Sequence, residues 1–344
     1  MMTRELAALR RLTPADYIDH PSGFLALSPR NQRFAVEGLP GFIAYRREGR
    51  HRIVVGGVHA ASFCREGLLD AFLRESARAG DRVVAVQVRE DQAAMFRRRG
   101  FRVDAFGSTL ALDLGRFSFA GTRRMKLRNR IKRAREAGLR VAELGVDVAA
   151  TPALWRQLEE TSRSWLARKG GTELDLLVGE LGQPGDPRRR VFVALDGDDQ
   201  PVAFITYVPV WGSRPGWLHD LTRRAPEAPA GAMELVNATA LERFQREGVP
   251  YLHFGLTPFV VDEKLRPDHW LVSRLIRWIG RFGSAIYPAR AQLQYKHKWS
   301  PELVETELIA FQKVSFSALW ALLVATRAFV PPWRRARLQQ GETP

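Results

Sequence analysis

Apolar and polar residues alternate over the segment Phe42–Val55 in a way that predicts two short strands joined by a glycine turn. A helical pattern over Leu68–Ala79 follows, and then a continuous apolar run over Val83–Val88 that is typical of a buried strand. Gly80 stands just past the helical pattern, where a glycine commonly ends a helix. This part of the chain is therefore predicted to form a hairpin, a helix and a strand.

The same order returns later in the chain. The segment Val191–Ile205 again predicts strand, turn and strand, Ala232–Glu247 predicts a helix, and Tyr251–Phe254 predicts a strand. Gly248 follows this second helix as Gly80 follows the first. Two copies of one pattern indicate a duplicated α/β unit.

The first copy continues with a short helix over Asp91–Arg99, the pair Gly100-Phe101 and another strand. This order resembles the GNAT fold of the Gcn5-related N-acetyltransferases, and it implies an α/β protein with two tandem GNAT-like domains, each a mixed central sheet flanked by helices. The expected division is an N-terminal helical extension over 1–20, a first GNAT-like domain over 21–116, a basic linker helix over 117–140, a second, catalytic GNAT-like domain over 141–312, and an apolar and basic helix with a tail over 313–344.

The charge balance adds a class of partner to this picture. The 344 residues include 53 Lys and Arg against 37 Asp and Glu, a net charge of +16. Such an excess favours nucleic acid, an anionic membrane or a phosphorylated substrate, and a bias toward arginine without functional meaning is the alternative. Cys64 is the only cysteine, and no histidines have HExxH spacing, so we expect no disulfide and no metal site.

Met1–Tyr17 lacks the apolar core of a signal peptide, and no run of about 18 apolar residues occurs. We therefore expect a cytoplasmic protein. Two segments suggest contact with phosphates or lipid: the basic helix over Arg123–Gly138, with Met125, Leu127 and Ile131 partly inward, and the apolar segment Phe316–Ala325. A solvated charged face and a packed C-terminal helix are the respective alternatives.

Candidate chemistry concentrates in the segment 220–234. It places Asp220 and Arg223 at the end of a strand, makes a Pro/Gly turn that includes Gly231, and opens into a helix at Glu234. Such a turn points backbone N–H groups and the positive end of a helix at one place, which suits an anion. With Asp220 and Glu234 flanking it, the segment suits a substrate that carries a phosphate and an amine.

Five blocks together resemble the soluble catalytic part of the lysyl- and alanyl-phosphatidylglycerol synthases, over about residues 20 to 312. The blocks are Met125-Lys-Leu-Arg-Asn-Arg130 with Glu136-Ala-Gly138; Ser164-Trp-Leu166 with Lys169, Glu173 and Gly179; Asp220-Leu-x-Arg223 with Pro226, Pro229, Gly231, Met233 and Glu234; Phe254-Gly-Leu-Thr-Pro-Phe259; and Lys296-His-Lys-Trp-Ser-Pro-Glu302. The resemblance implies transfer of an aminoacyl group from aminoacyl-tRNA to a hydroxyl of a phosphatidylglycerol-like headgroup, at the inner face of the membrane.

This reaction needs no cofactor, because the aminoacyl-tRNA ester is already activated. The family's membrane-embedded half is expected to be missing, so that the chain has no flippase domain. Leu303 and His253 also depart from the family pattern, which leaves the acceptor and the amino acid open.

Asp220, Glu234 and Arg223 are the candidate catalytic residues. Either carboxylate could bind the α-ammonium group, and Asp220 could instead be the general base, or simply pair with Arg223. Arg223 could clamp a phosphate. Glu234 could merely favour the helix N-terminus.

The candidate substrate-binding residues are Lys296, Lys298, Gly231, Thr257, Glu173 and Arg128. On an extended segment Lys296 and Lys298 would share a face and neutralise a phosphate, or they would guard a basic edge strand. His219 and His253 are weaker candidates for a base. Trp165, Trp217 and Trp299 could stack on a nucleotide, although core packing is the usual role of tryptophan.

Two other functions fit parts of the pattern. An acetyl-CoA-dependent N-acyltransferase would need a glycine-rich pyrophosphate loop, but the turn at 224–232 has one glycine and two prolines, and proline offers no N–H. A non-catalytic protein that binds RNA or membrane would explain the charge. It would not explain why the acidic and basic motifs are intact.

Overall fold

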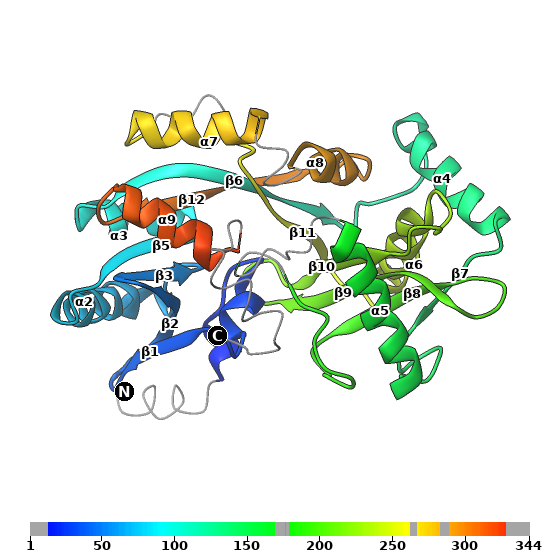
Figure 1. Ribbon diagram of the computed structural model, residues 1–344, viewed down its shortest axis with the longest axis horizontal. Coiled ribbons are helices and arrows are strands. Elements are labelled where there is room, and N and C mark those ends of the chain that lie inside the picture. Colours follow the sequence, from blue (N-terminus) through cyan, green and yellow to red (C-terminus); the bar gives the residue numbers. More distant parts are fainter. Residues whose placement is uncertain (1–12, 169–175, 177–178, 262–266, 283–288, 328–344) are drawn as a thin grey trace.

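The computed structural model describes residues 13–168, 176, 179–261, 267–282 and 289–327. Within these residues, twelve strands form one mixed sheet with helices on its faces (Figure 1). The order across the sheet is β1-β2-β3-β5-β12-β6-β11-β10-β9-β8-β7, and β4 pairs separately with β2. The strands are β1 Gln32–Val36, β2 Leu39–Glu48, β3 His51–Val55, β4 His59–Ala60, β5 Arg82–Val88, β6 Arg102–Asp113, β7 Arg140–Glu143, β8 Arg190–Leu195, β9 Pro201–Val210, β10 Gly216–Arg224, β11 Tyr251–Pro258 and β12 Leu303–Phe311.

The α-helices lie between these strands in the chain. They are α2 Ser62–Arg78, α3 Glu90–Arg98, α4 Met125–Glu136, α5 Pro152–Arg168, α6 Ala232–Arg246, α7 Trp270–Phe282, α8 Ala289–His297 and α9 Phe316–Ala325. Short 3-10 helices occur at η1 Pro14–Tyr17, η2 Gly23–Leu27 and η3 Thr122–Arg124.

The duplicated order of hairpin, helix and strand is confirmed. In the first copy the hairpin β2–β3 leads through α2 into β5, and in the second the hairpin β8–β9 and β10 lead through α6 into β11. Each copy contains one parallel pair whose strands are joined by a helix, β3 with β5 and β10 with β11. The helix returns the chain to the same end of the sheet, which only a crossover connection allows.

Strand β12 joins the two copies. It comes late in the chain, yet it lies between β5 and β6 of the first copy and pairs antiparallel with both. Strand β6 in turn pairs antiparallel with β11 of the second copy. The sheet therefore runs without a break from one copy into the other, and the division of the chain into domains at the expected residues stays a prediction.

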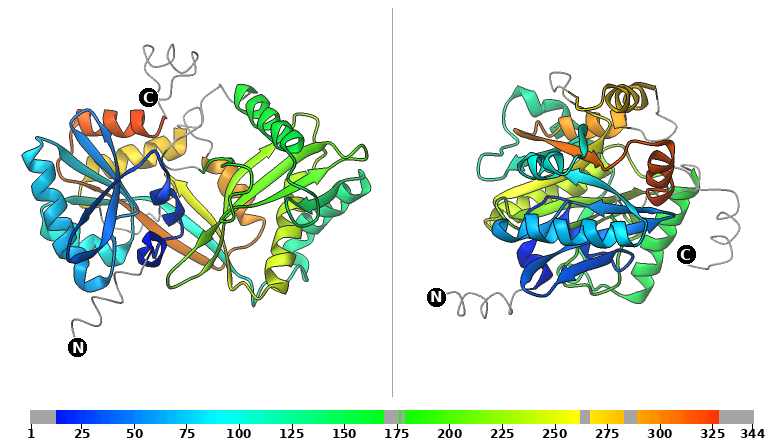
Figure 2. Two further views of the ribbon diagram at one scale, coloured as in Figure 1. Left: turned by 90° about the horizontal axis from the view of Figure 1, so that it is seen from below. Right: turned by 90° about the vertical axis from the view of Figure 1, so that its left-hand side faces the viewer.

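In the second copy, α5 and α6 cover opposite faces of the sheet (Figure 2). Alternate residues of β9 show which face is which: Phe204 packs with Trp155 and Leu158 of α5, whereas Ile205 and Tyr207 pack in the core of α6. These two surfaces are called the α5 face and the α6 face below.

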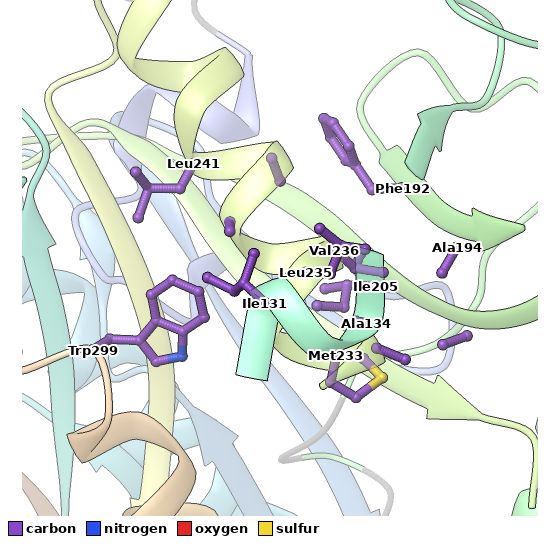
Figure 3. Close-up of a cluster of buried hydrophobic side chains, with 14 of the residues drawn as sticks. Ile131, Ala134, Phe192, Ala194, Ile205, Met233, Leu235, Val236, Leu241 and Trp299 are labelled. Atoms are coloured by element: carbon purple, nitrogen blue, oxygen red, sulfur yellow. The ribbon is translucent and has the colours of Figure 1, made fainter. Parts of the chain in front are cut away.

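The linker helix forms as expected at α4, and it packs along α6. Leu127, Ile131 and Ala134 are buried in the core of the α6 face, where Ile131 and Ala134 lie close to the start of α6 (Figure 3). Met125 is 50% exposed, so this side chain turns inward only in part. It is the first residue of the helix, two residues before the buried stripe begins at Leu127.

The C-terminal helix α9 packs on the sheet. Ala318, Ala321 and Ala325 are buried against strands of the first copy, together with Val272 and Ile276 of α7. No helix among the described residues is both long and apolar enough to cross a bilayer.

Candidate active site

Strands β10 and β11 lose contact with each other in the middle of the sheet. Their parallel pairing joins only Gly216–Leu218 of β10 with Tyr251–His253 of β11. Just beyond these pairs, both strands have an irregular register with their outer neighbours, β10 against β9 between His219 and Thr222 and β11 against β6 between His253 and Leu256. Asp220, Arg223 and Thr257 are candidate residues that all lie where β10 and β11 no longer pair with each other. These two stretches are called the divergent segments below.

Backbone groups freed by this divergence are taken up by side chains. Lys296 at the end of α8 donates from Nζ to Gly255 O at 2.9 Å, to Leu256 O at 3.1 Å and to Thr257 Oγ1 at 2.8 Å. On β10, the Leu221 N–H lies in the irregular stretch against β9 and donates to Thr206 Oγ1 of that strand at 3.0 Å. Because an unsatisfied buried peptide group costs about 1–3 kcal/mol, these side chains stabilise the divergence.

The setting of Lys296 is buried, and its hydrogen-bond partners are neutral. Burial lowers the pKa of Lys296 from 10.5 to about 7. All three hydrogens of its ammonium group are used by chain oxygens, so contact with a phosphate requires it to give up one of them. The segment is not extended here, because Lys296 lies in the last turn of α8 and Lys298 lies in the turn that follows the helix.

Asp220 lies on the α5 face in a buried ion pair. Its Oδ2 accepts from Arg189 Nη1 at 2.6 Å, and the two side chains are 3% and 4% exposed. Burial raises the pKa of Asp220, and the guanidinium of Arg189 opposes that shift. A Cβ at Gly179 would lie within 2 Å of the carboxylate, so only glycine lets the loop pass so close. Asp220 therefore pairs with Arg189 and not with Arg223.

Arg223 also lies on the α5 face, against α5 itself. Its Nε donates to Ser162 Oγ at 3.0 Å and its Nη1 to Thr222 O at 2.9 Å. The guanidinium carbon stands 4.3 Å from the ring centre of Trp165. Burial lowers the pKa of Arg223 to about 10, so the side chain remains charged at neutral pH.

Glu234 lies on the other face, at the start of α6. It is 5% exposed and accepts from Lys298 Nζ at 2.8 Å and from Arg130 Nη1 of α4 at 3.2 Å. Asp220 and Glu234 thus have separate partners on the two faces of the sheet. This differs from the expectation that the two carboxylates flank one point. Because the strand register is irregular at His219–Thr222, the positions of Asp220 and Arg223 could not be read from simple alternation.

Gly231 precedes α6 with φ of +96°, in the left-handed region. A Cβ there would lie 2.2 Å from Arg130 O, so the close approach that this glycine permits is that of α4. Arg128 Nη1 donates to Phe119 O and Gly121 O, both at 2.6 Å, and so holds the chain just before α4. Glu173 lies outside the described residues.

The two candidate histidines are buried and neutral. Burial lowers the pKa of His219 to about 3, with the charge of Lys296 adding to the effect, and it lowers that of His253 to about 4. His219 Nε2 shares a hydrogen bond with Thr222 Oγ1 at 2.7 Å, and His253 Nε2 one with Arg214 O at 3.0 Å. Side chains with such low pKa values are weak proton acceptors at neutral pH.

Two of the candidate tryptophans are packing residues. Trp299 is fully buried, and Trp217 stacks on Phe244 with ring centres 5.7 Å apart.

Sequence reasoning missed Arg189, the partner of Asp220. Its only signal is the run of three arginines that begins at Arg188, just before β8.

The duplicated unit, the crossover helices and the divergent pair of strands define an α/β protein with two GNAT-like units in tandem, as predicted. The chain belongs to the family described as phosphatidylglycerol lysyltransferase, C-terminal, whose model matches residues 10–311. It is 28% identical over 241 residues to the lysylphosphatidylglycerol biosynthesis bifunctional protein LysX of Nocardia farcinica, a match that covers 68% of this chain and 21% of that protein. The chain thus spans about a fifth of the length of the curated relatives that it matches.

Two solved structures share the fold. The C-terminal DUF2156 domain of a proposed lysylphosphatidylglycerol synthetase from Agrobacterium fabrum has a TM-score of 0.75 at 19% identity, covering 96% of this chain and 99% of that one. The structure of L-PGS from Bacillus licheniformis has a TM-score of 0.73 at 18% identity, covering 94% of this chain and 95% of that one. At this level of identity the likeness establishes the fold alone.

Proposed function

We propose that this chain transfers an aminoacyl group from aminoacyl-tRNA to a hydroxyl of a phosphatidylglycerol-like headgroup. The observation that carries the proposal is membership of the lysyltransferase family over residues 10–311. The buried charged groups on and beside the divergent segments support it, because the reaction needs a carboxylate for an ammonium group and cations for phosphates. The chain would work as a peripheral protein at the cytoplasmic face of the membrane, without a flippase domain in this segment.

The transfer is an exchange of esters. The headgroup hydroxyl attacks the carbonyl carbon of the aminoacyl ester, the bond from that carbon to the ribose oxygen of tRNA breaks, and the hydroxyl proton passes to the ribose oxygen. The donor is already activated, so neither ATP nor coenzyme A takes part. The work left to the protein is to orient the two substrates, move this proton and stabilise the oxyanion.

Asp220 is the residue to which we assign the central role. Its carboxylate is held in one orientation by Arg189 at 2.6 Å. Burial raises its pKa, a shift that makes a carboxylate a better proton acceptor. It would serve either as the general base for the hydroxyl or as the ligand of the α-ammonium group. Arg223, charged and fixed against Trp165, would orient a phosphate on the same face.

On the α6 face we assign Glu234 and Lys298 to substrate binding, with Gly231 and Arg128 shaping the approach of α4. The Glu234 carboxylate is the alternative ligand for the ammonium group, and it already holds two cations, Lys298 and Arg130. Lys296 and Thr257 hold β11 in its divergent course.

The test is transfer from a mixture of radiolabelled aminoacyl-tRNAs to a native lipid extract, followed by thin-layer separation. We expect a new labelled lipid whose formation ribonuclease prevents. Asp220→Asn keeps the shape of the side chain and should abolish this product. Asp199→Asn is the matched control, since Asp199 also pairs with an arginine at 2.6 Å but is 72% exposed. A labelled lipid made by Asp220→Asn at the wild-type rate would refute the assignment of Asp220.

A further inference from the structure

Helix α7 exposes large apolar side chains along one side. Trp270 is 61% exposed, Leu271 52%, Leu275 37% and Trp278 56%. These four are among ten large apolar side chains that are exposed in the described part of the chain, and they fall within nine consecutive residues. A cluster of this kind usually marks a surface for interaction, whereas single exposed apolar residues need no explanation.

The helix is held firmly enough to present this side to a partner. Val272 and Ile276 on its inner side are buried against the sheet. At its start, Asp268 accepts from Arg97 Nε at 2.9 Å and from the Val103 N–H at 3.1 Å, and the His269 N–H donates to Asp104 Oδ1 at 3.1 Å. The orientation of α7 is therefore set by contacts with the first copy.

The exposed side combines aromatic, aliphatic and basic residues. Arg274 and Arg277 are exposed beside Trp270 and Trp278, and no acidic residue occurs in the helix. Tryptophan with arginine is typical of helices that lie in the interface of a bilayer, where the rings enter the headgroup layer and the cations meet lipid phosphates. With 13 residues, α7 is too short to span the hydrocarbon core, which takes about 20.

We propose that α7 docks this protein on an anionic bilayer by lying in the plane of the interface. The docking surface consists of Trp270, Leu271, Leu275 and Trp278 with Arg274 and Arg277. Charge complementarity selects this occupant, since the chain carries a net charge of +16 and the inner leaflet is anionic. The proposal rests on the proposed function in that the acceptor is a membrane lipid. The proposal adds that α7 sets how the protein is oriented on the bilayer. Helices α7 and α8 lie along the same side of the molecule, so α8, which carries Lys296, would also face the membrane (Figure 1).

Co-sedimentation of the full chain with phosphatidylglycerol/phosphatidylcholine vesicles, without tRNA, tests the docking separately from the reaction. Wild type should bind these vesicles, and more weakly as salt rises. The double variant Arg274→Glu/Arg277→Glu should lose at least about thirtyfold in affinity, since each basic residue near an anionic surface contributes about 1 kcal/mol and the two new carboxylates are repelled by that surface. Trp270→Ser/Trp278→Ser should lose at least about tenfold, because two partly inserted rings return to water.

Matched controls decide between α7 and other surfaces. Phe63→Ser removes an aromatic side chain that is 75% exposed on α2, and Lys126→Glu/Lys132→Glu reverses two charges on α4. Both should bind vesicles like wild type. Vesicle binding that survives the α7 substitutions, that is lost through the α4 substitutions, or that is replaced by a change of oligomeric state in the α7 variants overturns the proposal.

A second readout separates docking from catalysis. The α7 variants should transfer the aminoacyl group to short-chain phosphatidylglycerol dispersed below its critical micelle concentration as fast as wild type, and should fail only on vesicles. An equal loss on both substrates overturns the docking role. If wild type makes no lipid product while vesicle binding still depends on α7, the proposed function fails and the docking surface stands.

Discussion

Replacing Lys296 by Met should change how the stability of the protein depends on pH. Methionine has a similar length and no charge, so the variant removes the titrating amine with little change in packing. The wild-type amine is buried, and burial lowers its pKa from the ordinary 10.5 to about 7. A displacement of this size corresponds to about 5 kcal/mol of penalty on the charged form in the folded state.

The sign of the change in stability with pH follows from the number of protons that the folded and the unfolded chain bind. Between pH 7 and 10.5 the unfolded chain holds a proton on this lysine and the folded chain does not, so the stability of wild type rises with pH. Above that window the penalty is absent, and below it the penalty is complete. From pH 7.5 to 9.5 the free energy of unfolding of wild type should rise by about 2–3 kcal/mol relative to Lys296→Met.

Urea unfolding at these two pH values measures the difference, and subtracting the variant cancels the other titrating groups. Lys132→Met is the control, because the Lys132 side chain is 74% exposed and its replacement leaves the Lys296 amine in place. A difference between wild type and Lys296→Met that is the same at both pH values would refute the reasoning. It would mean that the amine stays charged, held by its three oxygen acceptors.

Two further predictions concern the partners of the candidate residues. Arg189→Met leaves Asp220 buried without its cation, so it should lower the free energy of unfolding by about 3–5 kcal/mol and abolish transfer. Arg188→Met is the control and should do neither, because the Arg188 side chain is 56% exposed. Urea unfolding measures the first effect and the lipid assay the second. Gly231→Ala should cost about 1–2 kcal/mol through its φ of +96° and more through the contact with Arg130 O, while Gly248→Ala, with φ of +73° and open space around it, should cost the φ part alone. Equal destabilisation by the two glycine variants would show that α4 does not press on this position.

Much of the fold followed from local patterns. Alternation predicted both hairpins, and glycines marked the ends of α2 and α6, because each of these signals lies within a few residues of its consequence. The place of β12 between β5 and β6 left no such signal. The partner of a strand depends on contacts between residues some 200 positions apart, and an apolar strand does not carry the identity of its neighbours in its own sequence.

The candidate site was predictable in its residue types and less so in its geometry. The segment 220–234 correctly located a group of buried charges, but the irregular register of β10 sends Asp220 and Arg223 to the α5 face, while Glu234 starts a helix on the other. Lys296 was considered on an extended segment, where it would share a face with Lys298. Its helix ends there because the next residues turn toward β12.

The divergence of β10 and β11 also explains why a lysine stands at position 296. Where two parallel strands separate, the carbonyls that would have met the neighbouring strand need another donor. Gly255 O and Leu256 O find it in one ammonium group, which also holds Thr257, and Gly255 itself has φ of +65° at the same place. Glutamine has two hydrogens but lacks the lone pair by which a neutral lysine amine accepts from the Thr257 hydroxyl, so Lys296→Gln should leave one buried oxygen unsatisfied. An amine at position 296 is thus required by the course of the backbone, before any contact with a substrate is considered.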